Sequence, residues 1–214
     1  MELIKDGIID NEEYKKSSVK VLWILKEGNV AEGDENKQRD LCEEFRLNLH
    51  KNNALSIPTF RKMIYATYGI LYPEFEWKDV PFANENAYEV VKKIAYININ
   101  KSPAGSTSNY KDIKKAYEEN KEELIKQISE INPEVIVFGN TLYYFDFKDL
   151  DKIGWTISNS ARKYADEETK HTAFYKISSS KLCINAYHPA YPKIADKVYW
   201  DEIRKAYLFW KSNQ

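Results

Sequence analysis

Residues that could do chemistry lie where three apolar runs of the sequence end. Glu27 is a carboxylate that could position or deprotonate a water molecule, and Asn98 is an amide that could pair with a carbonyl and an adjacent N–H. His188 could donate a hydrogen bond to an oxyanion. Because open α/β sheets keep their chemistry at the carboxyl ends of their strands, we expect the three side chains to converge in one cleft.

His188 differs in its surroundings from the other two histidines of the chain, His50 and His171. It alone follows a predicted strand and precedes a proline, Pro189, which stops the hydrogen-bond ladder of that strand. Taken by itself, a histidine in a proline-stiffened turn is more often structural than catalytic. Polar groups at two further strand ends make a functional histidine the better interpretation.

The elements that must position these groups follow from hydrophobic periodicity. Short apolar, β-branched runs predict four strands, at 19–25, 94–99, 134–138 and 181–186. Helical spacing predicts helices at 37–51, 58–69, 84–93, 109–131 and 199–210, with Asn84 as an N-cap. Strands that alternate with helices predict an α/β fold, a three-layer α/β/α sandwich with a short, mainly parallel sheet of about four strands.

Length and composition limit the classes of protein. With 214 residues and no evident linker, the chain is expected to form one domain, residues 1–214. Its 33 acidic and 32 basic residues nearly cancel, so any nucleic-acid contact must come from a local patch. Two cysteines are too few for a disulfide scaffold or a four-cysteine cluster, which favours a reducing, cytoplasmic location. No apolar run is long enough to span a membrane, and the first residues do not have the layout of a signal peptide.

Four segments occur in a distinctive order along the chain. Residues 26–29 (Lys-Glu-Gly-Asn) follow the first predicted strand, and residues 98–101 (Asn-Ile-Asn-Lys) end the second. Residues 128–140 run from a helix end through a proline-led strand to a glycine, and residues 188–190 (His-Pro-Ala) follow the last strand. This ordered set, spread over residues 19–191, resembles the uracil-DNA glycosylase superfamily and is nearest to its thermostable bacterial and archaeal branch.

The resemblance implies a uracil-DNA glycosylase-like fold and a hydrolase that cleaves the N-glycosidic bond of uracil or a related damaged base in DNA, with no cofactor and no metal. Glu27 would orient the attacking water, with Asn29 as its substitute if the loop register is shifted by two residues. Gly28 would complete the loop that faces the substrate. His188 would stabilise negative charge on the pyrimidine O2.

Three further roles follow from the same resemblance. Asn98 would read the O4 and N3 edge of the base, Lys101 would contact a phosphate, and Tyr191 would wedge into the space left by the flipped base. Each has a plainer explanation, because Asn98 could cap a turn, Lys101 could be a solvated lysine and Tyr191 could be a packing residue. Glu27 could likewise be an ordinary loop acid.

The sequence also departs from the family pattern. The first loop lacks the family's proline and opening glycine, Ala190 stands in place of a serine, and the cluster-binding cysteines of the iron–sulfur members are absent. The altered loop favours a second hypothesis, a catalytically inactive module of this fold that binds a nucleotide, DNA or a protein partner, whereas Asn98 and His188 favour the enzyme. A third hypothesis, an unrelated nucleotide-binding α/β protein, lacks the glycine-rich phosphate loop that such proteins use.

Overall fold

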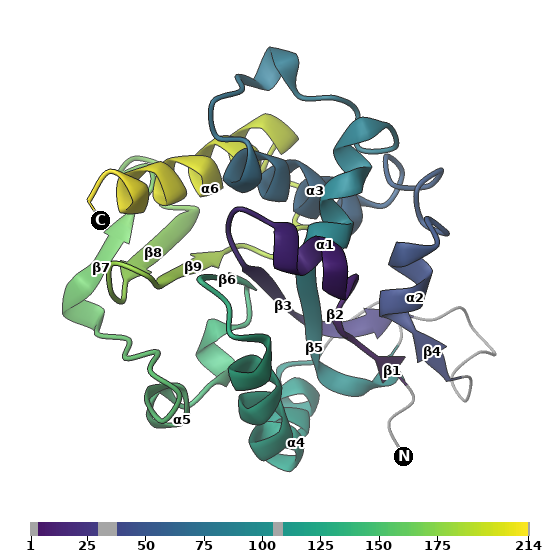
Figure 1. Ribbon diagram of the computed structural model, residues 1–214. Coiled ribbons are helices and arrows are strands. Elements are labelled where there is room, and N and C mark those ends of the chain that lie inside the picture. Colours follow the sequence, from purple (N-terminus) through teal and green to yellow (C-terminus); the bar gives the residue numbers. More distant parts are fainter. Residues whose placement is uncertain (1–3, 30–37, 105–108, 214) are drawn as a thin grey trace.

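The computed structural model describes residues 4–29, 38–104 and 109–213, without the side chains of residues 29, 103 and 104. Over these ranges the chain is a mixed α/β structure built around one large twisted sheet (Figure 1). The arrangement is that of a layered α/β protein, because helices lie against both faces of the sheet.

The large sheet has seven strands within the described residues, and its four central strands are parallel. In spatial order the strands are β2 (Gly7–Ile8), β5 (Ile94–Ala104), β3 (Val21–Asn29), β6 (Val135–Gly139), β9 (Leu182–Ala186), β8 (Thr172–Lys176) and β7 (Arg162–Tyr164). The outer strands β2, β8 and β7 are antiparallel to their neighbours. A separate two-stranded parallel sheet consists of β1 (Ile4–Lys5) and β4 (Arg39–Asp40).

The four predicted strand segments form the parallel core of this sheet, in the order β5-β3-β6-β9. The expected size of about four strands is too small, because antiparallel strands extend the sheet at both ends. β8 has buried side chains at four of its five positions, and β7 has only three residues. A strand buried on both faces shows no alternation of apolar and polar residues, and a very short strand shows too little of it to be recognised.

The register of the central strands decides which side chains meet at the carboxyl edge of the sheet. Glu27 of β3 pairs with Asn100 of β5, and Ile24 of β3 pairs with Phe138 of β6. Phe138 in turn pairs with Asn185 of β9. Because these strands run in the same direction, the ends of β3 and β9 reach the same edge although β6 separates them.

Helices pack against both faces of the sheet. The α-helices are α1 (Asn11–Lys16), α2 (Leu41–Arg46), α3 (Pro58–Leu71), α4 (Tyr110–Ile131), α5 (Phe147–Asp151) and α6 (Asp196–Lys211). The 3-10 helices are η1 (Trp77–Asp79), η2 (Asn86–Lys93), η3 (Leu142–Tyr144) and η4 (Asn159–Ala161). α3 and α6 lie side by side on one face, and α4 covers the other (Figure 1).

Alternation of side chains along β3 divides the core into two parts. Trp23 and Leu25 belong to the cluster beneath α3 and α6, whereas Leu22 and Ile24 belong to the cluster beneath α4. The buried indole of Trp23 donates from Nε1 to the hydroxyl of Thr67 on α3, at 2.9 Å. β3 is therefore covered on both faces, as its nearly continuous apolar sequence requires.

The predicted helix at 37–51 is much shorter in the structure. Residue 37 lies outside the described residues, and α2 covers only Leu41–Arg46. Turns follow, and Asn48 adopts a left-handed backbone conformation, with a φ of 62°, through which an α-helix cannot continue. The early end of α2 lets His50 fold back onto Glu44.

The remaining predicted helices have different outcomes. Three of them correspond to α3, α4 and α6. The segment 84–93 instead forms the 3-10 helix η2. Asn84 is not its N-cap, because Glu85 takes that position and the side-chain oxygen of Asn84 is buried without a hydrogen-bond partner in the described chain.

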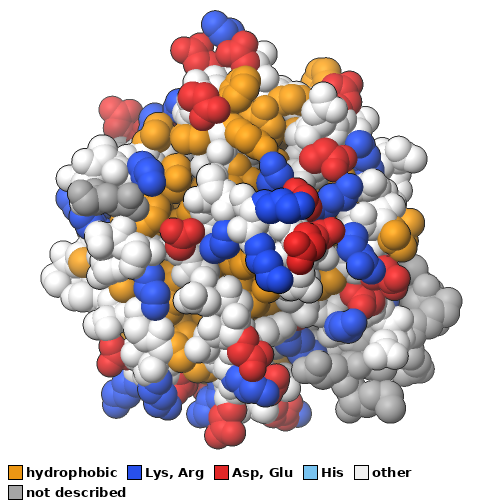
Figure 2. Space-filling view, in the orientation of Figure 1, with side chains coloured by type: hydrophobic (Ala, Val, Ile, Leu, Met, Phe, Trp, Pro, Cys, Tyr) orange, Lys and Arg blue, Asp and Glu red, His pale blue; other side chains and the backbone are white. Residues whose placement is uncertain are grey.

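Acidic and basic side chains are interspersed over the face shown in Figure 2, as the net charge of −1 leads one to expect. Apolar side chains are also visible there between the charged groups. No helix in the described parts of the chain is long and apolar enough to cross a membrane.

Gly69 of α3 lies directly against α6. A Cβ atom added at Gly69 would lie 2.7 Å from Nε1 of Trp200, closer than real Cβ contacts come. The packing of α3 on α6 therefore requires a residue without a side chain at position 69.

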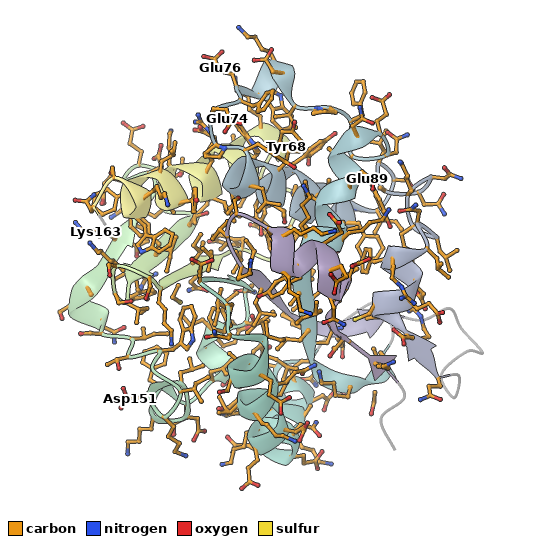
Figure 3. All side chains as sticks on the ribbon, in the orientation of Figure 1. Tyr68, Glu74, Glu76, Glu89, Asp151 and Lys163 are labelled. Carbon is orange, nitrogen blue, oxygen red and sulfur yellow. The ribbon has the colours of Figure 1, made fainter. Side chains whose placement is uncertain are left out.

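The residue before Gly69 is Tyr68, which lies near Glu74 (Figure 3). Its ring packs against Tyr72, with the centroids 4.8 Å apart.

Gly69→Ala is expected to lower the free energy of unfolding by about 1–3 kcal/mol, because the added methyl group overpacks the contact with Trp200. In an exposed helix the same substitution raises stability by up to about 1 kcal/mol, so the sign of the change is diagnostic. Urea unfolding followed by circular dichroism measures it. An unchanged or higher midpoint would mean that the two helices have room to separate.

Candidate active site

A cavity of about 590 Å³ opens at the carboxyl edge of the sheet, where β3 meets the loop after β9. One wall is aromatic and consists of Phe45, His50, Phe60 and Tyr96. The polar lining includes Lys26, Glu27, Arg39, Thr59, Asn140 and His188. This size, and the combination of apolar wall and few polar groups, are typical of sites that bind small molecules. We call it the edge cavity.

His188 lies half-buried in the wall of the edge cavity, in the loop after β9. The backbone N–H of Ala190 donates to its Nδ1 at 3.1 Å. Burial and the positive charges of Lys26 and Lys62 lower the pKa of His188 to about 4, so its imidazole is neutral at physiological pH. Because Nδ1 accepts a hydrogen bond, the ring proton resides on Nε2, which is therefore a donor.

The loop that carries His188 is anchored by buried groups. Lys62 of α3 donates from Nζ to the carbonyl oxygen of Tyr191 at 2.6 Å, and its side chain is buried. The hydroxyl of Tyr199 donates to the carbonyl oxygen of Tyr187 at 2.9 Å. The rings of Tyr187 and Tyr191 are stacked, with centroids 5.0 Å apart and planes at 25°. Tyr191 thus lines the edge cavity as one member of a stacked pair.

Glu27 lines the edge cavity from the end of β3 and is half-buried. The side-chain amide of Asn100 donates from Nδ2 to its Oε2 at 3.3 Å. Asn100 was not among the predicted site residues, because its closeness to Glu27 depends on the register of β3 with β5. The contact restrains the carboxylate and leaves it facing the cavity.

Asn98 is fully buried and does not line the edge cavity. The hydroxyl of Tyr96 donates to its Oδ1 at 3.3 Å, but its Nδ2 has no hydrogen-bond partner among the described residues. A Cβ atom added at Gly28, which lines the cavity, would lie 3.9 Å from this nitrogen. Since a buried amide without a partner costs about 1–3 kcal/mol, Asn98 holds an unused donor immediately behind the cavity wall.

Lys101 lies apart from Glu27 and His188, and the side chain of Asn29 is outside the described part of the structure. Lys101 is buried and directs its Nζ to Asp6 at 2.5 Å and to Gln127 at 2.9 Å, so it is part of a buried ion pair outside the cavity lining. The backbone of Asn29 pairs with β5. The structure therefore brings Glu27, Gly28, His188 and Tyr191 together at the cavity, whereas Asn98 and Lys101 do not line it.

A cluster of Arg39, Glu44 and His50 borders the edge cavity and was missed in the sequence. The guanidinium of Arg39 donates two hydrogen bonds to the Glu44 carboxylate, at 2.9 and 2.5 Å, and Nε2 of His50 lies 2.9 Å from the same carboxylate. Burial opposes ionisation of Glu44, but the contacts with His50 and Arg39 outweigh it and lower its pKa to about 2. Spacings of five and six residues do not place three side chains on one helical face. The helix predicted for this segment therefore gave no reason to expect the cluster.

No protein-family model matches this chain, and no curated protein sequence matches it. Within the described residues there is also no group of three His, Cys, Asp or Glu side chains placed to hold a metal ion. The chemistry of the edge cavity therefore has to be argued from its own side chains.

The His188 ring is expected to carry its proton on Nε2 at neutral pH and to titrate with a midpoint near 4 rather than near the ordinary 6.5. Two-dimensional NMR of protein with ¹⁵N-labelled histidine measures both properties, and His188→Gln assigns the signal by removing it. A proton on Nδ1, or a midpoint near 6.5, would contradict the neutral donor described above.

Proposed function

We propose that the protein is a uracil-DNA glycosylase-like hydrolase that cleaves the N-glycosidic bond of uracil or a related damaged pyrimidine in DNA. The observation that carries the proposal is that Glu27 and His188, 161 positions apart in the sequence, line the same cavity at the carboxyl edge of the sheet. A carboxylate and a neutral histidine are the two groups that such a reaction requires, one for the water and one for the leaving base.

The edge cavity suits a base that has been flipped out of its strand. Its volume of about 590 Å³ exceeds what one pyrimidine ring occupies and leaves room for the attached sugar. Phe45, Phe60 and Tyr96 supply apolar surface against which a planar base can pack. A base seated against this wall would lie between the carboxylate on β3 and the imidazole after β9.

His188 would stabilise the leaving group. As the C1′–N1 bond breaks, its electron pair passes to the base, and negative charge grows on the pyrimidine O2. The Nε2–H of a neutral imidazole donates to that oxygen, and this contact is stronger in the transition state than in the ground state. The positive charges of Lys26 and Lys62 that depress the pKa of His188 also favour an anionic leaving group nearby.

Glu27 would orient the attacking water and accept its proton. The water oxygen forms the new bond to C1′, and the proton that the water loses passes to the Glu27 carboxylate, while the released base anion takes a proton from solvent. Asn100 restrains this carboxylate at 3.3 Å, which reduces the number of orientations that it can adopt.

Tyr191 would hold the substrate. Asn98 is fully buried behind Gly28 and does not line the cavity, so we assign it no direct contact with the base. Tyr191 is half-buried at the cavity and would contact the strand around the flipped nucleotide. Lys101 has no part in the proposal, because its ammonium group is buried against Asp6.

A second candidate is a module of the same fold that binds a nucleotide without cleaving it. The specific observation in its favour is Lys26, a cation that lines the cavity wall and acts electrostatically on His188. This lysine would hold a phosphate whether or not the first loop can position a water. The two candidates differ in one measurable property, the release of free base.

Single-turnover assays with excess protein and a uracil-containing oligonucleotide test the proposal. We expect free uracil from the wild type and a loss of about 10²-fold or more in His188→Ala, the usual scale for removing one preorganised oxyanion donor. Phe82→Ala is the control, because Phe82 is 62% exposed and does not line the cavity. Equal rates in a folded His188→Ala protein would remove the assigned role, and binding without any base release would favour the second candidate.

A further inference from the structure

Three tyrosine rings form a partly exposed group beside the edge cavity. Tyr110 begins α4, and Tyr143 and Tyr144 belong to η3. Tyr110 is 53% exposed and Tyr143 is 48% exposed, whereas Tyr144 is buried beneath them. We call these three residues the tyrosine platform. What distinguishes Tyr110 and Tyr143 from other exposed apolar side chains is that they lie together, with stacked rings on adjoining elements.

The two exposed rings of the tyrosine platform are held nearly parallel, and Tyr144 is tilted by 35° against Tyr143. The planes of Tyr110 and Tyr143 differ by only 10°, with centroids 5.9 Å apart, and Tyr110 also stacks on Tyr144 at 5.3 Å. The hydroxyl of Tyr143 donates to the hydroxyl of Tyr144 at 3.1 Å. The backbone of Tyr144 is fixed in turn, because Lys114 donates to its carbonyl oxygen at 3.0 Å. The exposed rings are therefore oriented before any ligand arrives, which lowers the entropy cost of stacking on them.

The tyrosine platform adjoins the edge cavity. Asn140, which lines the cavity, lies two residues before η3, and the hydroxyl of Thr141 donates to the carbonyl oxygen of Ile24 on β3 at 2.8 Å. Burial raises the pKa of Tyr144, and the neighbouring tyrosines and the charge of Glu27 raise it further, so Glu27 is within electrostatic reach of this ring. A strand whose base occupies the cavity beside Glu27 would pass next to the platform.

The charges around the tyrosine platform indicate stacking as the main attraction. Lys111 and Lys114 follow Tyr110 in the first turns of α4, but Asp112 lies between them and Lys114 also pairs with Glu118 at 2.8 Å. The chain as a whole has a net charge of −1. A surface that relied on phosphate contacts would need a larger excess of cations, whereas stacking on tyrosine needs none.

We infer that the tyrosine platform binds an unpaired nucleobase of the substrate strand, next to the nucleotide that enters the edge cavity, and that the protein consequently acts on single-stranded DNA in preference to duplex. This inference rests on the proposed function for the occupant of the cavity. In single-stranded DNA the neighbouring base is free to stack on the tyrosines. In duplex DNA the same base is already stacked and paired, so stacking on the tyrosines must first offset the loss of those contacts.

Binding of a fluorescently labelled, uracil-free single-stranded oligonucleotide, followed by anisotropy, tests the inference. Tyr110→Ala and Tyr143→Ala are each expected to weaken binding about 10-fold or more, while the matching Phe variants, which keep the ring, bind like the wild type. Phe82→Ala is the matched control, because Phe82 is 62% exposed and lies outside the cavity lining. The wild type should bind the same sequence less tightly as duplex than as a single strand. The alanine substitutions should leave the affinity for duplex unchanged.

Equal single-strand affinity in wild type and alanine variants, or an equal loss for single strand and duplex, would overturn the inference. The assay is independent of hydrolysis, because the oligonucleotide contains no uracil. A wild type that binds single strands through the tyrosines but releases no base would overturn the proposed hydrolysis and leave the platform standing. Base release from single strands with unaltered binding in the tyrosine variants would overturn the inference about the platform and leave the proposed hydrolysis standing.

Discussion

The parallel pairing of β3 with β5 on one side and β6 on the other is the constraint on which the rest of the structure depends. It pairs the backbone of β3 along both of its edges, and it sets Glu27 opposite Asn100 at the carboxyl edge. It also carries β6, and through β6 the strand β9, into the same direction, so that the loop with His188 arrives at that edge. The edge cavity exists because these strand ends coincide.

Burial then determines the chemical state of the groups around the edge cavity. His188 is neutral because burial and two nearby lysines disfavour its charged form, and Ala190 directs the ring proton to Nε2. Glu44, by contrast, is held ionised because Arg39 and His50 outweigh the cost of its burial. The cavity thus presents a neutral donor on one side and a neutralised charge cluster on the other, both fixed before a ligand binds.

Sequence patterns predicted the parallel core of the sheet but only part of the candidate site. Long apolar runs report burial directly, which is why the four central strands could be recognised, whereas β7 and β8 were too short or too evenly buried. Spacing along one strand cannot show register between strands, so the contact of Asn100 with Glu27 was not predicted. A lysine after a strand is usually solvated, and only the fold shows that Lys101 is buried against Asp6.

Under the proposed function, the edge cavity receives a flipped pyrimidine between Glu27 and His188. A crystal structure with a single-stranded oligonucleotide that contains 2′-fluoro-2′-deoxyuridine tests it most directly, because the fluorine disfavours positive charge at C1′ and slows cleavage. We expect the uracil ring to lie against the aromatic wall, with its O2 within hydrogen-bond distance of His188 Nε2 and a water between Glu27 and C1′. A bound strand whose uracil lies outside the edge cavity, or whose O2 faces away from His188, would contradict it.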